Sequence, residues 1–125
     1  MQTNELRILI CDDSIMVQKK MDDLLKSHGY ANIFQARNGQ TAVDAYKEHR
    51  PHVVFMDIVM PVKTGVEALV EIIAFDPDAK VYMASSIGTQ SNIKEAITKG
   101  AADFLQKPID DALLLKLLLN VCKQL

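Results

Sequence analysis

Short apolar runs alternate along the chain with longer stretches of helical periodicity. The runs are rich in β-branched and aliphatic residues and comprise Arg7 to Cys11, Ile33 to Ala36, Val53 to Met56, Val81 to Ala84, and Phe104 to Gln106. Their length and flanking turn residues predict buried strands, with crossover helices between them. Because right-handed crossovers place helices on both faces of a parallel sheet, the pattern predicts a doubly wound α/β fold with five strands and five helices.

The stretch after the first run predicts a helix with one buried stripe. The stripe recurs at steps of mostly three and four and consists of Val17, Met21, Leu24, Leu25 and His28. Gly29 can end this helix, because glycine readily adopts the left-handed conformation that follows many helices. His28 closes the stripe and is interpreted as a helix-end residue rather than as a ligand. The second helix is expected from Thr41 to His49, with Pro51 marking its stop.

Three more helices follow from the same periodicity. Gly65 opens the third, which closes at Asp76-Pro77, and Gly100 ends the fourth. The residues expected to face the sheet are Val66, Leu69, Ile72 and Ile73 in the third helix and Ile93, Ala96 and Ile97 in the fourth. The fifth helix is expected from about Ile109 to Lys123.

The fifth helix carries more apolar residues than a narrow face requires. Its central stripe is Leu113, Leu114, Leu117, Leu118 and Val121, flanked by Leu115, Leu119 and Cys122. Two interpretations stay open. The buried face can simply be wide. Alternatively, the extra residues form a docking patch for a partner or a second copy, because exposed apolar patches tend to mark contacts.

Composition and charge narrow the class of protein. With 125 residues and 49% hydrophobic content, residues 1–125 are expected to form one domain, with no output domain attached. The formal net charge of -2 provides no excess positive charge for nucleic acid or for an anionic membrane. No signal peptide or membrane-spanning stretch is predicted, since spanning a bilayer takes about 20 apolar residues. Cys11 and Cys122 lie in apolar runs, which favours buried, reduced thiols in a cytoplasmic protein.

Three acidic residues directly follow predicted strands. Asp12 and Asp13 come after the first strand, and Asp57 comes after the third. The carboxyl ends of parallel strands open on one edge of the sheet, where ligands bind. Two carboxylates at about 4 Å repel each other by about 4 kcal/mol at an effective dielectric constant of about 20, so a cation or a proton is needed to offset the repulsion. All-oxygen ligands with positions open to water suit Mg²⁺.

Each of these polar residues also has an ordinary structural explanation. Asp12 or Asp13 can cap the first helix, and Asp57 can be a turn acid. Lys107 can be a solvent-exposed lysine in a turn between a strand and a helix. Ser85 and Ser86 can be ordinary residues at the end of a strand. All of them, however, fall at the carboxyl ends of the first, third, fourth and fifth predicted strands. That shared edge favours a functional site over coincidence.

Several residues at these strand ends form a joint pattern that is highly specific. The pattern consists of Asp12-Asp13, Met56-Asp57 followed by Met60-Pro61 and Gly65, Ser85-Ser86, Gly100-Ala101, and Lys107-Pro108. In these residues the chain resembles receiver domains of bacterial and archaeal response regulators, and more narrowly the stand-alone CheY-like proteins of chemotaxis. The resemblance covers essentially the whole chain. It implies the flavodoxin-like, or CheY-like, fold with strand order 2-1-3-4-5.

The resemblance also implies a phosphoryl-transfer chemistry. Asp57 would be the nucleophile that takes a phosphoryl group from a phosphohistidine of a histidine kinase. Mg²⁺ would bind Asp13, Asp57 and the backbone carbonyl of Val59, with Asp12 acting mainly through water. Lys107 would bring a compact positive charge to the phosphoryl oxygens.

The remaining implied roles concern geometry and switching. The bond between Lys107 and Pro108 is typically cis in this family, which would aim the lysine at the site. Ser85 would hydrogen-bond the phosphoryl group and draw the following loop inward. Phe104 stands at a switch position where many receivers carry Tyr, a residue that the best-known chemotaxis members use in binding the motor.

Other positions depart from the family pattern. Thr64 replaces a frequent Asp, but threonine can still cap the following helix. Val59 and Ile87 are apolar at positions that border the path of the hydrolytic water in this family. We therefore expect a longer phosphoryl lifetime than in members with polar residues there.

The leading hypothesis is a signalling switch, not a turnover enzyme, whose phosphorylated state binds a target such as a flagellar motor switch or another regulator. A phosphorelay intermediate or another single-domain regulator is the alternative. An aspartyl-phosphate phosphatase would need a second acid where Val59 stands. A flavin carrier is disfavoured because Asp12-Asp13-Ser14 would repel a cofactor phosphate. The expected oligomeric state is a monomer or a weak dimer.

Overall fold

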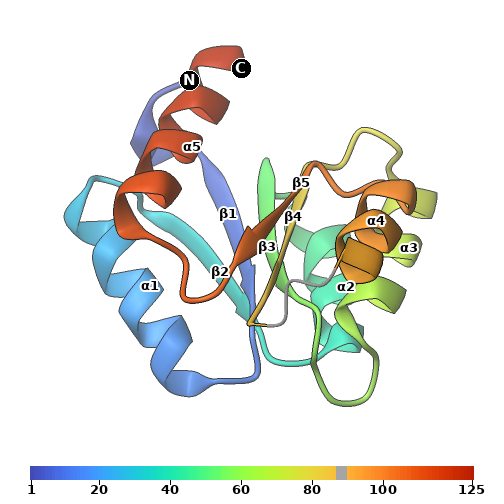
Figure 1. Ribbon diagram of the computed structural model, residues 1–125. Coiled ribbons are helices and arrows are strands. Elements are labelled where there is room, and N and C mark those ends of the chain that lie inside the picture. The colour runs from blue at the N-terminus through green and yellow to red at the C-terminus, as the bar shows by residue number, and fades with distance from the viewer. Residues whose placement is uncertain (87–89) are drawn as a thin grey trace.

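The computed structural model describes residues 1–86 and 90–125. Helices and strands alternate along the chain (Figure 1). The elements are η1 (Thr3–Glu5), β1 (Arg7–Cys11), α1 (Ile15–Ser27), β2 (Asn32–Ala36), α2 (Gly39–His49), β3 (Val53–Asp57), α3 (Gly65–Phe75), β4 (Val81–Ser85), α4 (Gln90–Thr98), β5 (Asp103–Gln106) and α5 (Asp111–Gln124). Each of the five predicted strands and helices is therefore present, with ends shifted by at most a few residues.

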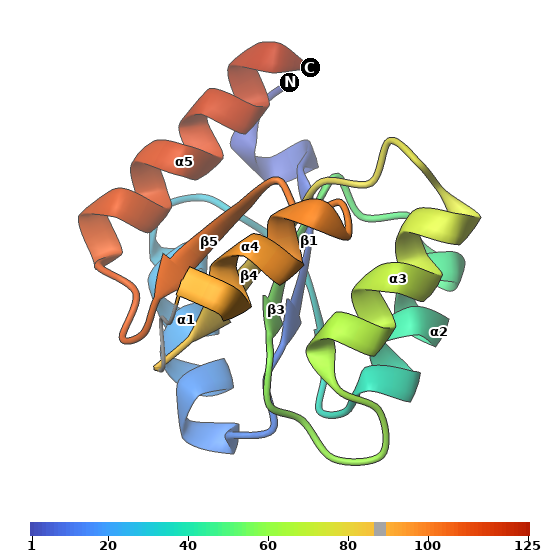
Figure 2. The ribbon, with the colours of Figure 1, turned by 45° about the vertical axis from the view of Figure 1, so that its right-hand side comes forward.

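The strands form one parallel sheet in the order β2-β1-β3-β4-β5. Helices α1 and α5 cover one face of the sheet, and α2, α3 and α4 cover the other (Figures 1 and 2). The two termini lie side by side, where the amino group of Met1 donates to the carbonyl of Cys122 at 3.1 Å. The predicted doubly wound fold and its strand order are confirmed.

Side-chain alternation along the strands divides the core into two halves. On β1, Ile8 and Ile10 pack into the cluster that includes residues of α1 and α5, whereas Leu9 and Cys11 pack into the cluster that includes residues of α2 and α3. Successive strand residues point to opposite faces, so a strand covered on both sides reads as a continuous apolar run. The acidic residues predicted from the sequence thus lie at the ends of β1 and β3, two strands that are buried along almost their whole length.

Side-chain caps explain where the helices begin. Ser14 caps α1 by accepting from the Val17 amide, so neither Asp12 nor Asp13 is the N-cap residue. Asn38 caps α2 in a reciprocal pair with Thr41, and the helix therefore starts at Gly39, two residues before the predicted start.

The other two resolved caps concern α3 and α5. Thr64 caps α3 by accepting from the Glu67 amide at 3.2 Å, as predicted. Asp110 caps α5, which moves its start to Asp111, beyond the predicted Ile109.

Burial corrects three expectations about helix faces. His28 is the C-cap of α1 and is exposed, because it has left the helical conformation and no longer continues the stripe. Ile97 and Leu113 are half exposed, so α4 contributes Ala96 to the core and the predicted stripe of α5 loses its first member. Gln18 is buried instead, which the apolar pattern did not predict.

The apolar excess of α5 is divided between core and surface. Leu114, Leu118, Val121 and Cys122 are buried, and Leu115 and Leu117 pack partly against the same cluster. Leu119 remains half exposed. The wide-face interpretation therefore accounts for most of the excess. Both cysteines are buried free thiols, as predicted. Among the described residues, no helix is long and apolar enough to cross a membrane.

Candidate functional site

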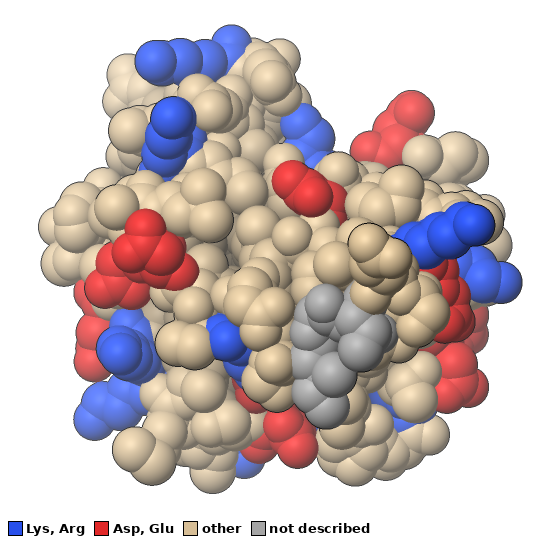
Figure 3. Space-filling model, viewed as in Figure 1, with Lys and Arg blue, Asp and Glu red and all other residues tan. Residues whose placement is uncertain are grey.

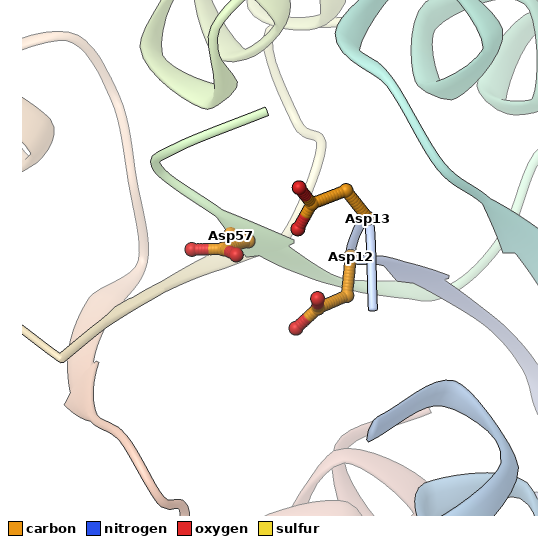
Figure 4. A group of neighbouring side chains, drawn as sticks. All are labelled: Asp12, Asp13 and Asp57. Atoms are coloured by element: carbon orange, nitrogen blue, oxygen red, sulfur yellow. The ribbon is translucent and has the colours of Figure 1, made fainter. Parts of the chain in front are cut away.

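The polar residues predicted from the strand ends meet at one edge of the sheet. Asp12 and Asp13 follow β1 and Asp57 ends β3, and Figure 4 shows these side chains gathered at the carboxyl ends of the two neighbouring strands. Ser85 ends β4, and Lys107 follows β5. Parallel pairing places these ends together although the residues are up to 95 positions apart in sequence.

The three carboxylates form a group that can hold a small cation. One oxygen from each of Asp12, Asp13 and Asp57 lies within 4.8 Å of the others. Asp12 is buried, Asp57 is half-buried and Asp13 faces solvent, so the group combines fixed ligands with access to water. Carboxylate oxygens with water-accessible positions are the donor set that Mg²⁺ prefers. The residues present therefore fit a magnesium ion.

Lys107 supplies positive charge to two of these acids. Its Nζ donates to Asp12 Oδ2 at 2.7 Å and to Asp57 Oδ2 at 3.3 Å. The peptide bond between Lys107 and Pro108 is cis, as the family resemblance implied. The Lys107 amide also donates to the Ser85 carbonyl at 2.9 Å, so the lysine is attached to the neighbouring strand at its main chain.

The ionisation of Lys107 reflects the balance between burial and its acidic partners. Burial alone would lower the pKa of the ammonium group. The hydrogen bond to Asp12 and the negative charges of Asp57 and Asp12 outweigh that effect, and the pKa is raised above its ordinary value. Lys107 is therefore a cation at neutral pH.

Asp57 occupies a less polar setting than an ordinary surface acid. Burial raises its pKa, and the neighbouring charge of Lys107 opposes this only in part. A cavity of about 290 Å³ opens beside Asp57 and Lys107, and its walls include Ile10, Phe55 and Leu114. The apolar walls limit the hydration of the Asp57 carboxylate. A bound cation would compensate for this lost hydration.

The main chain behind Asp57 is in close contact with α3. A Cβ atom on Gly65 would lie 2.0 Å from the Asp57 carbonyl oxygen, and the Gly65 amide donates to the Ile58 carbonyl at 2.8 Å. Only glycine fits at this approach. Gly65 thus does more than open a helix, because its missing side chain allows the end of β3 to pack against it.

The loop after β3 carries apolar side chains outward. Val59 is 67% exposed, and its amide approaches Asp57 Oδ1 at 3.4 Å. Val62 is also exposed and has a positive φ of 71°, a backbone conformation that strains a β-branched residue. Lys63 attaches this loop to α2 and α3 through Gln40 and Glu71.

The predicted switch residues lie on the neighbouring strands. Ser85 is buried at the end of β4, and Phe104 is partly buried on β5 beside the α2–α4 half of the core. The exposed Ser86 carbonyl accepts from Gln106 Nε2 at 2.9 Å, joining the ends of β4 and β5. Ile87 lies outside the described residues.

One buried polar residue near the site was missed by the analysis of the sequence. Gln18 donates from its side-chain amide to the carbonyls of Asp12 and Ala36. Its spacing was a usable signal, because positions 18, 21 and 25 are three and four residues apart and share one face of α1. A polar residue on that apolar line indicates a specific buried partner.

Known proteins resemble this chain in sequence and in fold. The family model described as "Response regulator receiver domain" matches residues 8–119. The chain is 39% identical to chemotaxis protein CheY of Thermotoga maritima, over 94% of this chain and 98% of that protein. It is 44% identical to CheY of Bacillus subtilis, over 82% of this chain and 85% of that one.

Solved structures agree with the sequence relatives. A chain in the CheX-CheY-BeF3-Mg²⁺ complex of Borrelia burgdorferi superposes with a TM-score of 0.86 at 36% identity, covering 93% of this chain and 88% of that chain. CheY4 of Vibrio cholerae gives a TM-score of 0.85 at 27% identity, covering 93% and 98%. Phosphorylation and magnesium binding are general in this group. With its sheet order, its acidic group and its relatives in agreement, this chain belongs to the response regulator receiver domain family.

Proposed function

We propose that Asp57 is the phosphoacceptor of a chemotaxis-type response regulator and takes its phosphoryl group from a histidine kinase. The observation that carries this proposal is the meeting of Asp57 with two further carboxylates and with Lys107, whose Nζ is 3.3 Å from Asp57 Oδ2. This arrangement provides a nucleophile, ligands for a cation, and a fixed positive charge.

In the transfer step, a carboxylate oxygen of Asp57 attacks the phosphorus of the phosphohistidine. The P–N bond breaks, its electron pair returns to the imidazole nitrogen, and an acyl phosphate remains on Asp57. Asp13, Asp57 and the Val59 carbonyl would hold Mg²⁺ directly, and Asp12 would hold it mainly through water. The bound ion would supply charge neutralisation at the phosphoryl oxygens.

Lys107 and Ser85 would then recognise the modified state. Lys107 would keep its shorter contact with Asp12 and exchange its longer contact with Asp57 for a phosphoryl oxygen. Ser85, at the adjacent strand end, would donate its hydroxyl to the same group. Movement of the chain at Ser85, together with a change in the position of the Phe104 side chain, would alter the surface that a target binds.

The partners follow from this switching role. A histidine kinase would be the donor, and a flagellar motor switch or another regulator would be the target. The Borrelia relative was solved with CheX, which supports recognition by a protein partner. Acidic and basic side chains are interspersed on the face shown in Figure 3, which supports neither a nucleic-acid nor a membrane partner. We propose a cytoplasmic monomer or weak dimer with residues 1–125 as one receiver domain.

A switch fits this chain better than a turnover phosphatase does. The position two residues after the phosphoacceptor holds exposed Val59, which can neither donate nor accept a proton. A phosphatase of the aspartyl-phosphate type would need an acid there. A phosphorelay intermediate uses the same chemistry as the proposed regulator and differs only in the acceptor of the phosphoryl group.

Intact mass after incubation with acetyl phosphate and Mg²⁺ tests the proposal. Wild type should gain one phosphoryl group as acetate leaves. The gain should disappear in Asp57→Asn and in the presence of EDTA. Asp44→Asn, on the exposed surface of α2, is the matched control and should be modified like wild type. Absence of modification in wild type under all conditions, or undiminished modification of Asp57→Asn, would contradict the assignment.

A further inference from the structure

Gln18 is a buried polar residue in the second turn of α1. Its relative exposure is 2%, and the other buried polar or charged residues within the described ranges are Asp12 and Ser85. Both of those residues belong to the proposed phosphoacceptor site. The burial of a long amide side chain next to them requires its own explanation.

The amide group of Gln18 joins three elements at the site edge. Its Nε2 donates to the Asp12 carbonyl at 2.9 Å and to the Ala36 carbonyl at 2.6 Å. The Asp12 amide donates to the same Ala36 carbonyl at 3.0 Å. These hydrogen bonds connect the carboxyl ends of β1 and β2 to each other and to α1 at Asp12.

Asp12 is consequently held at all of its polar groups. Its main chain contacts Gln18 and Ala36, its Oδ1 accepts from the Ser14 amide at 2.9 Å, and its Oδ2 accepts from Lys107. The hydrogen bond from Gln18 to the Asp12 carbonyl restrains the peptide plane between Asp12 and Asp13. Rotation of that plane would redirect both carboxylates.

Stability alone does not explain this side chain. Gln18 Oε1 is buried and has no hydrogen-bond partner in the described part of the chain, which is an unfavourable state for an acceptor. An unbranched apolar residue of similar size would fill the same space and avoid that cost, but it would remove the donor to the Asp12 carbonyl. The two donated hydrogen bonds are therefore the contribution that distinguishes glutamine from methionine here.

We propose that Gln18 is a positioning residue for the metal centre. By fixing the Asp12–Asp13 peptide, it holds the two carboxylates in the arrangement that binds Mg²⁺ together with Asp57. It contacts neither the ion nor the phosphoryl group. This inference rests on the proposed function, and it adds a residue of α1 to the parts that prepare the site before the ion arrives.

The test compares Gln18→Met with Leu25→Val, a mild core substitution farther along the same helix. Mg²⁺ is titrated into each unphosphorylated protein, and Kd is obtained from amide shifts in NMR spectra after thermal unfolding has shown that both variants are folded. Gln18→Met should raise the Mg²⁺ Kd by about tenfold, the lower end of the range for outer-shell partners. Its Asp13 amide signal should shift even before Mg²⁺ is added. Leu25→Val should leave both quantities unchanged at a comparable loss of thermal stability.

Gln18→Asn provides a second variant, since it retains the amide but is one methylene too short to reach both carbonyls. It should also weaken Mg²⁺ binding. Wild-type Kd values in Gln18→Met or Gln18→Asn would overturn the positioning role, while acetyl phosphate labelling of Asp57 would show the proposed function intact. Failure of wild type to bind Mg²⁺ at all would overturn both the metal centre and the role of Gln18 in it.

Discussion

Replacement of Gly65 by alanine tests the packing behind Asp57, the proposed phosphoacceptor. The added Cβ would lie 2.0 Å from the Asp57 carbonyl oxygen and 2.8 Å from its carbonyl carbon. Both neighbours are main-chain atoms, so no side-chain rotation can relieve the contact. The strand end and the start of α3 must separate by about 1 Å, because protein interiors are already close-packed.

Two measurable losses follow from this separation. Overpacking of this kind costs about 1–3 kcal/mol in unfolding free energy, which urea denaturation will measure. A displacement of about 1 Å at a reacting group can also slow its chemistry by about 100-fold, so phosphorylation of Asp57 by acetyl phosphate should fall by up to that factor. Intact mass against time measures the phosphorylation rate.

Gly39→Ala is the matched control for Gly65→Ala. Its Cβ would meet the Lys63 carbonyl oxygen at 2.1 Å, an equally severe main-chain contact that does not involve Asp57. It should lose comparable stability and retain more of the phosphorylation rate. The reasoning is refuted if Gly65→Ala has wild-type stability, or if it is destabilised and still phosphorylated as fast as wild type.

Three further predictions concern charge, pH and phosphoryl lifetime. Lys107→Met should slow phosphorylation by about 100-fold in the same mass assay, because it removes the cation beside Asp57. His52 Nδ1 accepts from the Arg7 amide at 2.9 Å, and burial lowers the pKa of His52 below its ordinary 6.5. Its stabilising effect is complete above pH 6.5 and is lost as pH falls through the lowered pKa, so urea denaturation should show the free energy of unfolding decreasing over that range. Val59→Asn should shorten the half-life of phosphorylated protein by about 2- to 10-fold, since an amide can orient the hydrolytic water but is not a base.

Each of these predictions has a control on the same molecule. Lys80→Met removes a lysine that donates a hydrogen bond to Gln124, away from the site. It should leave the phosphorylation rate unchanged. Wild type is the reference for His52→Gln, which should reduce the pH dependence of stability because it removes the ring that the Arg7 amide contacts. Val70→Asn, on exposed α3, should not alter the phosphoryl half-life. If a variant and its control have equal effects, the role proposed for that residue is wrong.

The sequence by itself determined the fold class and most of the site. Strand and helix signals are local, and the parallel arrangement brings all strand carboxyl ends to one edge. The sequence pattern is therefore enough to place Asp12, Asp13, Asp57 and Lys107 together. Helix starts were predicted less accurately at α2 and α5, because the caps Asn38 and Asp110 lie outside the apolar pattern.

Only the tertiary structure decided the contacts between segments that are distant in the chain. The spacing of residues does not reveal that Lys107 is closer to Asp12 than to Asp57, or that Gln18 is buried against two strand ends. It does not reveal that Gly65 must lack a side chain because the carbonyl of Asp57 lies against it. Such distances depend on how packed layers settle against one another, and local periodicity carries no information about them.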